Sequence, residues 1–143
     1  MNISTILATK GDFVATVTPD ATVADLLATL AEHGIGAAVV SRDGRIVEGI
    51  ASERDVARTL ASQGADVLHA PVADIMTAVI STCSPDSTIA DIAAQMTDNR
   101  TRHVPVMDEH NELIGIVSIG DLVKARIDAL EEERRNLVSY ITT

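Results

Sequence analysis

The chain has 143 residues and a formal net charge of −10, from 11 basic and 21 acidic residues. A charge of this sign argues against a protein that binds the nucleic-acid backbone or docks on an anionic lipid surface, because both tasks need a basic surface. Aromatic residues make up only 1% of the chain, so it also lacks the rings on which single-stranded nucleic acids stack.

The composition supports a hydrophobic core without disulfides. Hydrophobic residues make up 46% of the sequence, and Cys83 is the single cysteine, so an internal disulfide cannot form. The N-terminus shows no basic and apolar leader, and no apolar run approaches the roughly 20 residues of a membrane span. We therefore expect a cytoplasmic protein with one domain or with two small halves that share a core.

Strand and helix patterns alternate along the chain. The apolar spacing after Thr22 is helical, and Thr22-Val23-Ala24-Asp25 fits a capping box. In chain order we expect an amphipathic turn at residues 3–7, a strand at 13–17, a helix from 22 to 34, strands at 35–40 and 46–51 around a turn at 42–44, and a helix from 52 to 64. After a crossover at 65–71, the same order is expected as a strand at 80–83, a helix from 88, and strands at 102–107 and 113–117.

A long helix is expected from Gly120 nearly to the end of the chain. Its apolar stripe is interrupted by Arg134, and the three acidic residues 131–133 lie on its polar side. The stripe needs cover, most simply from a second copy of the chain, which predicts a homodimer; the alternative is that the helix folds back on its own domain. The residues of the stripe are Val123, Ile127, Leu130, Leu137 and Ile141.

The chain contains an internal repeat. The string GIASERD at residues 49–55 returns as GIVSIGD at residues 115–121, which is an offset of 66. Near the start of each unit the offset is 69, because Ile6-Leu7 matches Ile75-Met76 and the first unit carries three additional residues around 10–12. A repeat at a fixed period indicates one structural unit built twice, and hence two equivalent places for a ligand.

With the repeat laid out, the chain resembles a pair of CBS domains, the module named after cystathionine β-synthase. The resemblance rests on the two G-h-x-S-x-x-D strings (h is apolar), on RHVPV at residues 102–106, and on the unit starts Thr16-Val17 and Thr82-Cys83. It covers essentially the whole chain, and residues 118–141 look like the end of small stand-alone bacterial CBS-pair proteins.

This resemblance implies an α+β fold of two β-α-β-β-α units that pack face to face around a pseudo-twofold axis. It also implies clefts between the two sheets and, usually, disc-like dimers. We place the first unit at residues 1–70, the second unit at residues 71–125, and a C-terminal helix extension at residues 126–143.

The resemblance also implies an adenosine ligand, which is AMP, ADP, ATP, NAD(H) or S-adenosylmethionine. A carboxylate such as Asp55 can accept both vicinal hydroxyls of a ribose, and the helix start near Ser52 favours an anion. The first site is expected to comprise Lys10, Thr16, Val17, Gly36, Ala37, Ala38, Ser52, Arg54 and Asp55. The second is expected to comprise Thr82, Cys83, Arg102, His103, Val104, Pro105, Ser118 and Asp121. Which residues of each unit share a cleft stays open. Gly120 stands in the second unit where Arg54 stands in the first, so we expect two unequal sites.

Structural roles compete with these binding roles. The pairs Ser52/Asp55 and Ser118/Asp121 also fit capping boxes, each contributing about 1 kcal/mol, and the two roles are compatible. His103 is either a ligand contact or an ordinary strand histidine. Cys83 fits a small core residue better than a reactive thiol. The histidines show no metal-ligand spacing, so we expect no metal site.

The expected function is therefore a non-catalytic adenine-nucleotide sensor, of energy state for example, that binds AMP or NAD(H) and acts on a protein effector in trans. The acidic balance favours AMP or NAD(H) over ATP, because it repels polyphosphates. The alternative is a structural or protein-interaction module with empty clefts. We expect neither an enzyme nor a catalytic cofactor, since the chain is too short for a barrel of about 250 residues and shows no nucleophile elbow, P-loop or Rossmann fingerprint.

Overall fold

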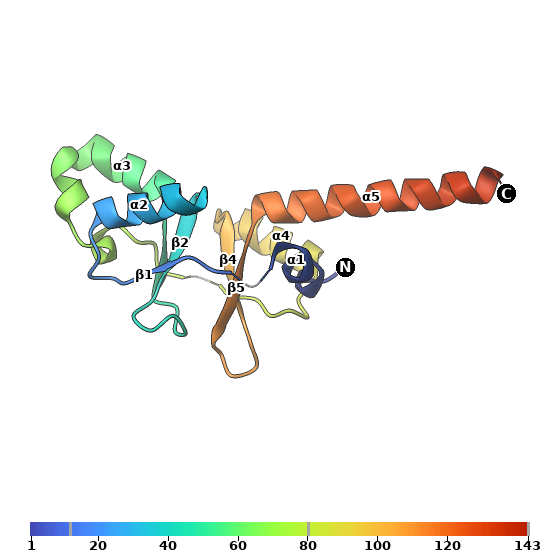
Figure 1. The fold of residues 1–143 in the computed structure, drawn as a ribbon, viewed down its shortest axis with the longest axis horizontal. Helices are drawn as coiled ribbons and strands as arrows, with labels where there is room; N and C mark the ends of the chain where they lie inside the picture. The colour runs from blue at the N-terminus through green and yellow to red at the C-terminus, as the bar shows by residue number, and fades with distance from the viewer. Residues whose placement is uncertain (12, 80, 143) are drawn as a thin grey trace.

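The mixed helix and strand pattern folds into two halves that lie side by side, with a long C-terminal helix that projects beyond them (Figure 1). The computed structural model describes residues 1–11, 13–79 and 81–142. Its helices are α1 (Ile3–Lys10), α2 (Val23–His33), α3 (Glu53–Gln63), α4 (Ile89–Asn99) and α5 (Ile119–Thr142). Its strands are β1 (Thr16–Val17), β2 (Ala37–Val40), β3 (Gly49–Ser52), β4 (His103–Met107) and β5 (Leu113–Ser118). The α+β expectation is confirmed.

The first half is a three-stranded sheet with α2 and α3 packed against it. Strand β2 is central, parallel to β1 and antiparallel to β3. Every residue of β2 is buried, as expected for a small, apolar, β-branched run. The core includes Val17, Leu26, Leu30, Ala38 and Val56.

The second half repeats this plan with a reduced sheet. Strands β4 and β5 pair antiparallel. The strand expected at residues 80–83 is reduced among its described residues to one parallel bridge between Cys83 and Val106, and Ile80 lies outside the described residues. The bridge is the counterpart of the pairing of Val17 with Val40 in the first half, which confirms the offset of 66 in three dimensions.

The helix starts follow the expected capping chemistry. Thr22 and Asp25 form a reciprocal capping box at α2, and Ser52 and Asp55 form one at α3. At α4 the bond from the Asp91 N–H to Thr88 Oγ1 is formed, at 3.1 Å, while the backbone beside Thr88 pairs with the start of the chain. Local sequence therefore determines where these helices begin.

The β2–β3 connection differs from the expected hairpin. The return strand begins at Gly49 rather than at residue 46. The Asp43 carboxylate accepts the N–H groups of Arg45 and Ile46 at 2.8 and 3.0 Å, which folds this segment on itself. These hydrogen bonds lower the pKa of Asp43. The segment thus forms an Asx-type loop instead of a tight turn, because its N–H groups are unavailable to a ladder.

The start of the chain packs on the second half. Ile3 and Ile6 of α1 are buried in the core of that half, together with Ile92, Val104 and Val117. The expectation assigned residues 1–70 to the first unit, and the expected turn at 3–7 is instead a helix that covers the other unit. The two halves thereby share a helix, as expected for units so small that each alone would be only marginally stable.

The two units exchange this segment reciprocally. A Cβ at Gly115 of β5 would lie 2.8 Å from Leu7 Cδ2, and a Cβ at Gly49 of β3 would lie 2.8 Å from Met76 Sδ. Leu7 and Met76 are the residues that the offset of 69 matches. The first segment of each unit therefore packs against a strand glycine of the other unit. At Gly49 the contact continues as a hydrogen bond from the N–H of Ile50 to the carbonyl of Thr77, at 3.0 Å.

Alanine at these two glycines is expected to have unequal effects on stability. Gly49→Ala also brings the new Cβ within 2.9 Å of the Thr77 carbonyl oxygen, a backbone atom that cannot turn aside. We expect a loss of about 1–3 kcal/mol in the free energy of unfolding, as for other overpacked sites. Gly115→Ala meets the end of a flexible leucine and is expected to cost less than about 1 kcal/mol. Urea unfolding of both variants measures the difference, and equal losses would contradict this account.

Candidate functional site

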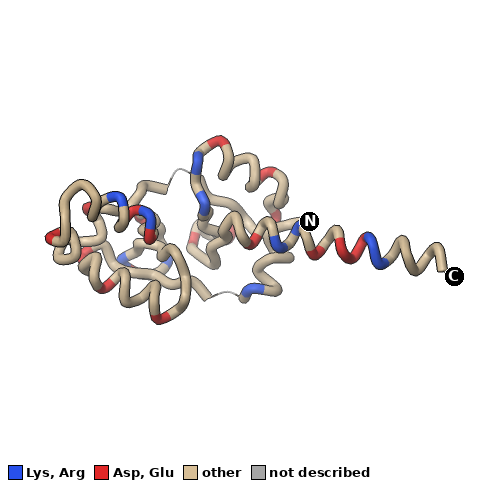
Figure 2. Tube along the Cα trace, turned by 90° about the horizontal axis from the view of Figure 1, so that it is seen from above, with Lys and Arg blue, Asp and Glu red and all other residues tan. Residues whose placement is uncertain are grey.

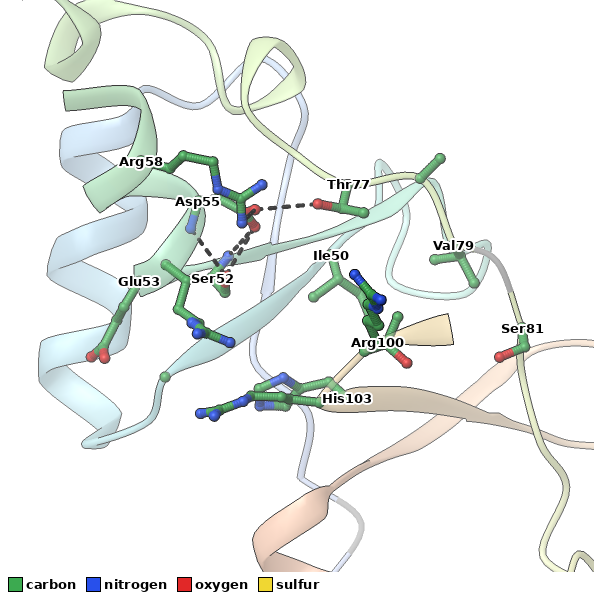
Figure 3. Close-up of a pocket in the computed structure, with 15 residues that line it drawn as sticks. Ile50, Ser52, Glu53, Asp55, Arg58, Thr77, Val79, Ser81, Arg100 and His103 are labelled. Carbon is green, nitrogen blue, oxygen red and sulfur yellow. Dashed lines mark hydrogen bonds and ion pairs between the residues drawn. The ribbon is translucent and has the colours of Figure 1, made fainter. Parts of the chain in front are cut away.

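A cavity of about 250 Å³ lies where the two halves meet, and Figure 3 shows its walls. One wall is the end of β3 and the start of α3, the second is the segment between the units, and the third is the approach to β4. The lining residues are Gly36, Ile50, Ser52, Glu53, Arg54, Asp55, Arg58, Thr77, Ala78, Val79, Ser81, Arg100, Thr101, Arg102 and His103. Both units therefore contribute to one site.

Asp55 is the buried acid of this cavity. Its side chain is 9% exposed, and its Oδ2 accepts the backbone N–H of Ser52 at 2.9 Å and the Ser52 hydroxyl at 3.0 Å. Its Oδ1 accepts the Thr77 hydroxyl at 3.2 Å (Figure 3). The capping box thus holds the carboxylate in place, and the neutral Thr77 hydroxyl occupies a position that a hydroxyl of a ligand can take over.

The cavity is basic within an acidic protein. Four arginines line it, against the two carboxylates of Glu53 and Asp55. Acidic residues elsewhere are spread over both halves (Figure 2). The expectation that the acidic surface repels polyphosphates does not apply at this cavity, because its local charge is positive. The arginines are Arg54, Arg58, Arg100 and Arg102.

Arg100 holds an unusual backbone conformation. It ends α4 in the left-handed region at φ 55°, and its counterpart at the end of α2 is Gly34, at φ 62°. A residue with a Cβ is disfavoured there relative to glycine. From this conformation the Arg100 side chain lines the cavity, a place that Gly34 leaves without a side chain in the first unit.

The second G-h-x-S-x-x-D motif makes a different set of contacts. Asp121 Oδ2 accepts the backbone N–H of Ser118 at 2.8 Å, and the N–H of Asp121 bonds Ser118 Oγ at 3.1 Å, so this pair caps α5. Lys10 Nζ donates to Asp121 Oδ2 at 2.7 Å and to the Ile116 carbonyl at 2.8 Å. Burial by itself raises the pKa of Asp121, but the Lys10 and Ser118 hydrogen bonds outweigh it and lower that pKa below its ordinary value.

Lys10 therefore lies away from the place the sequence suggested. The sequence offers it as a cation candidate beside Ser52 and Arg54, whereas the structure pairs it with Asp121, because α1 crosses to the second half. Asp12, its neighbour in the three additional residues, lies outside the described residues.

His103 stands between the two motifs. It lines the cavity of Asp55, and its strand pairs it with Ser118 of the other motif. Burial lowers the pKa of His103, and the charge of Lys10 lowers it further, against an opposing effect of Asp121. At neutral pH His103 is thus an uncharged hydrogen-bonding group, and it was expected in the second site.

Several expected site residues are core residues instead. Val17 and Ala38 belong to the first core, and Cys83 and Val104 belong to the second. Burial raises the pKa of the Cys83 thiol to about 11, in keeping with a core role. Ala37 and Pro105 are also buried, Thr16 and Thr82 are exposed, and none of these eight lines the cavity. Gly36, Ser52, Arg54, Asp55, Arg102 and His103 are the expected residues that do line it.

Sequence reasoning missed the segment between the units. Thr77 and Val79 line the cavity, and Arg58 approaches Asp55 Oδ1 at 3.7 Å. The sequence held a signal for two of these residues. Arg58 lies one helical turn after the candidate Arg54, and Val79 follows Met76 by three positions, as the candidate Lys10 follows Leu7.

The described residues also bear on metal binding and on membrane insertion. Within residues 1–11, 13–79 and 81–142, no group of three or more His, Cys, Asp or Glu side chains is arranged to hold a metal ion. None of the described helices has the length and apolar character needed to cross a membrane.

Comparison with known proteins relates this geometry to a family. The sequence model of the CBS domain matches twice, at residues 8–62 and 72–128. A mitochondrial CBS domain-containing protein of Arabidopsis thaliana, CBSX3, is 38% identical over 128 residues, which are 87% of this chain and 62% of that protein. The chain thus spans less than two thirds of the length of this relative.

Solved structures of CBS-domain proteins resemble this fold. A CBS-domain protein from Agrobacterium tumefaciens shares 43% identity and a TM-score of 0.83, over 88% of this chain and 99% of that one. A CBS domain protein from Pyrobaculum aerophilum, solved in complex with AMP, shares 28% identity and a TM-score of 0.79, over 92% of this chain and 97% of that one. With two matched units, a paired fold and a cavity lined from both units, this chain belongs to the CBS domain family, as a CBS-domain pair.

Proposed function

We propose that this protein is a non-catalytic regulatory module that binds an adenine nucleotide in the cavity beside Asp55. The observation that carries the proposal is a fixed, buried carboxylate at one end of a cavity whose lining holds four arginines. A ribose with its two vicinal hydroxyls suits the carboxylate, and phosphates suit the arginines. The AMP complex of the Pyrobaculum aerophilum relative supports this chemistry.

The size and charge of the cavity narrow the ligand. At about 250 Å³ it is smaller than the roughly 300–1,000 Å³ of pockets that enclose drug-sized ligands. It fits one nucleoside whose phosphates extend along the arginines better than a dinucleotide such as NAD(H). Four guanidinium groups disfavour the cationic S-adenosylmethionine. We therefore favour AMP, ADP or ATP, and expect affinity to rise with the number of phosphates.

Calorimetric titration of AMP, ADP, ATP, NADH and S-adenosylmethionine into the full chain tests the ligand class. We expect ATP to bind at least tenfold more tightly than AMP, and no heat from S-adenosylmethionine.

Arg100→Gly separates stability from binding, because it relieves the left-handed backbone and removes one guanidinium at once. It should unfold at a higher urea concentration yet bind ATP more weakly. Heat with none of the five compounds would favour the alternative of an interaction module with an empty cleft.

We also propose that the protein is a homodimer joined through α5. The apolar residues of this helix are 46–80% exposed at positions 123, 127, 130, 137 and 141, where the helix projects from the body (Figure 1). With Arg134, these positions alternate by four and three, which is the seam of a coiled coil. In a parallel pair, Arg126 of one protomer faces Glu131 of the partner subunit. The other positions that flank the seam bring no two like charges together across the dimer.

Such a dimer provides a route from ligand to effector. The nucleotide contacts both units, so its binding can change how the units sit on α5, and a protein effector in trans can read that change. With a single cysteine, we place this function in a reducing compartment, the cytoplasm.

A further inference from the structure

The surroundings of the two motif aspartates differ at one position that faces the carboxylate. The offset of 66 equates Asp121 with Asp55, and Lys10, at the edge of the three additional residues, follows Leu7 by three positions, as Val79 follows Met76. The apolar Val79 lines the cavity beside Asp55, the motif aspartate of the first unit. Beside Asp121, the motif aspartate of the second unit, Lys10 Nζ lies 2.7 Å from Oδ2. The position beside the motif aspartate is therefore occupied by an apolar side chain at Asp55 and by a cation at Asp121.

Lys10 is held at Asp121 by more than one contact. Its ammonium also donates to the Ile116 carbonyl at 2.8 Å, and α1, which carries it, is anchored by the fully buried Ile3. The counterpart of Thr77, whose hydroxyl contacts Asp55, is Ala8, which has no side-chain donor. At Asp55 a ribose competes with a neutral hydroxyl on Oδ1, whereas at Asp121 it competes for a carboxylate whose charge is already balanced by a short, charge-assisted bond from Lys10 to Oδ2.

The second cleft is also poorer in phosphate-binding groups. The counterparts of Arg54, Arg100 and Arg102 are Gly120, Gly34 and Gly36. Three of the four arginines of the first cavity therefore correspond to glycines, and the fourth, Arg58, corresponds to Lys124. A nucleotide gains less from its phosphates there, so it has less to set against the ion pair of Lys10 and Asp121.

We infer that Lys10 is an internal latch that keeps the second cleft closed to nucleotide, so that the native chain binds one nucleotide and not two. This inference rests on the proposed nucleotide-binding function and deepens it. Lys10 balances the charge of Asp121 through Oδ2, and it ties α1 to the start of α5 at the same time.

Equilibrium dialysis with labelled AMP, carried to saturation, tests the latch. We expect the native chain to bind one AMP and Lys10→Val, which copies Val79, to bind two, the second at least tenfold more weakly. Lys10→Met should also bind two, and Lys10→Arg, which keeps the ion pair, should bind one. Adding Asp55→Ala to Lys10→Val should leave only the second site. In the reverse exchange, Val79→Lys should lower the affinity of the first site at least tenfold.

The outcomes separate the latch from the proposed function. One AMP bound to both the native chain and the Lys10→Val and Lys10→Met variants would overturn the latch and leave nucleotide binding intact. Two AMP molecules bound to the native chain would overturn it as well. No AMP bound to any variant, together with no binding of ATP to the native chain, would overturn the proposed function and the latch.

Discussion

Asp55→Ala is expected to abolish nucleotide binding, with an affinity loss of at least 100-fold. The carboxylate accepts both ribose hydroxyls in the proposed complex, and hydrogen bonds to a charged group contribute about 1.5–3 kcal/mol each. The same change removes half of the capping box at the start of α3, so the protein also loses about 1 kcal/mol of stability. Titration calorimetry with ATP measures the affinity, and urea unfolding measures the stability.

The chain offers a matched control for this variant. Asp25 forms the same capping box with Thr22 at the start of α2, and it does not line the cavity. Asp25→Ala should lose the capping contribution that Asp55→Ala also loses, about 1 kcal/mol, and keep native affinity. An equal loss of affinity in both variants would show that Asp55 acts only through the fold. Native affinity in Asp55→Ala would exclude it from the site.

Leu130→Glu is expected to convert the proposed dimer into a monomer. In a coiled coil through α5, Leu130 occupies a seam position and is buried in both protomers. Burial of a leucine contributes about 1.5–3 kcal/mol, so the dissociation constant of the dimer should rise at least 100-fold. Analytical ultracentrifugation over a range of concentrations measures this constant.

Arg134→Leu provides a change of opposite sign at the same seam. A charged residue at a seam position lowers the stability of a coiled coil while it specifies register. The variant should therefore dimerise more tightly than the native chain. If α5 instead covers its own body in solution, neither variant will change the mass, and a monomer at all concentrations would exclude the dimer.

Much of the fold could be predicted because it is encoded locally. Thr22 and Ser52 mark helix starts by their own hydrogen bonds, and Gly34 ends α2 in the left-handed conformation. These features depend on residues three or four positions apart, which a sequence displays directly. The loop after Ser41 was missed because the Asp43 carboxylate competes with the ladder for N–H groups.

The candidate site was predicted only in part, for a different reason. Ser52 and Asp55 were found through the repeat, but the sequence left open which residues share a cleft, and the structure pairs Lys10 with Asp121. Its position depends on α1 crossing to the other unit, a long-range exchange that no local pattern encodes. Thr77 and Val79 were missed for the same reason, because the segment between the units becomes a cavity wall only when the halves pack.

A crystal structure of the full chain with ATP tests the central claim most directly. The account predicts one nucleotide per chain, with its ribose on Asp55, its phosphates along Arg54 and Arg102, and Lys10 still paired with Asp121. A nucleotide bound at Asp121 with the Asp55 cavity empty would contradict the assignment of the site and of the latch together.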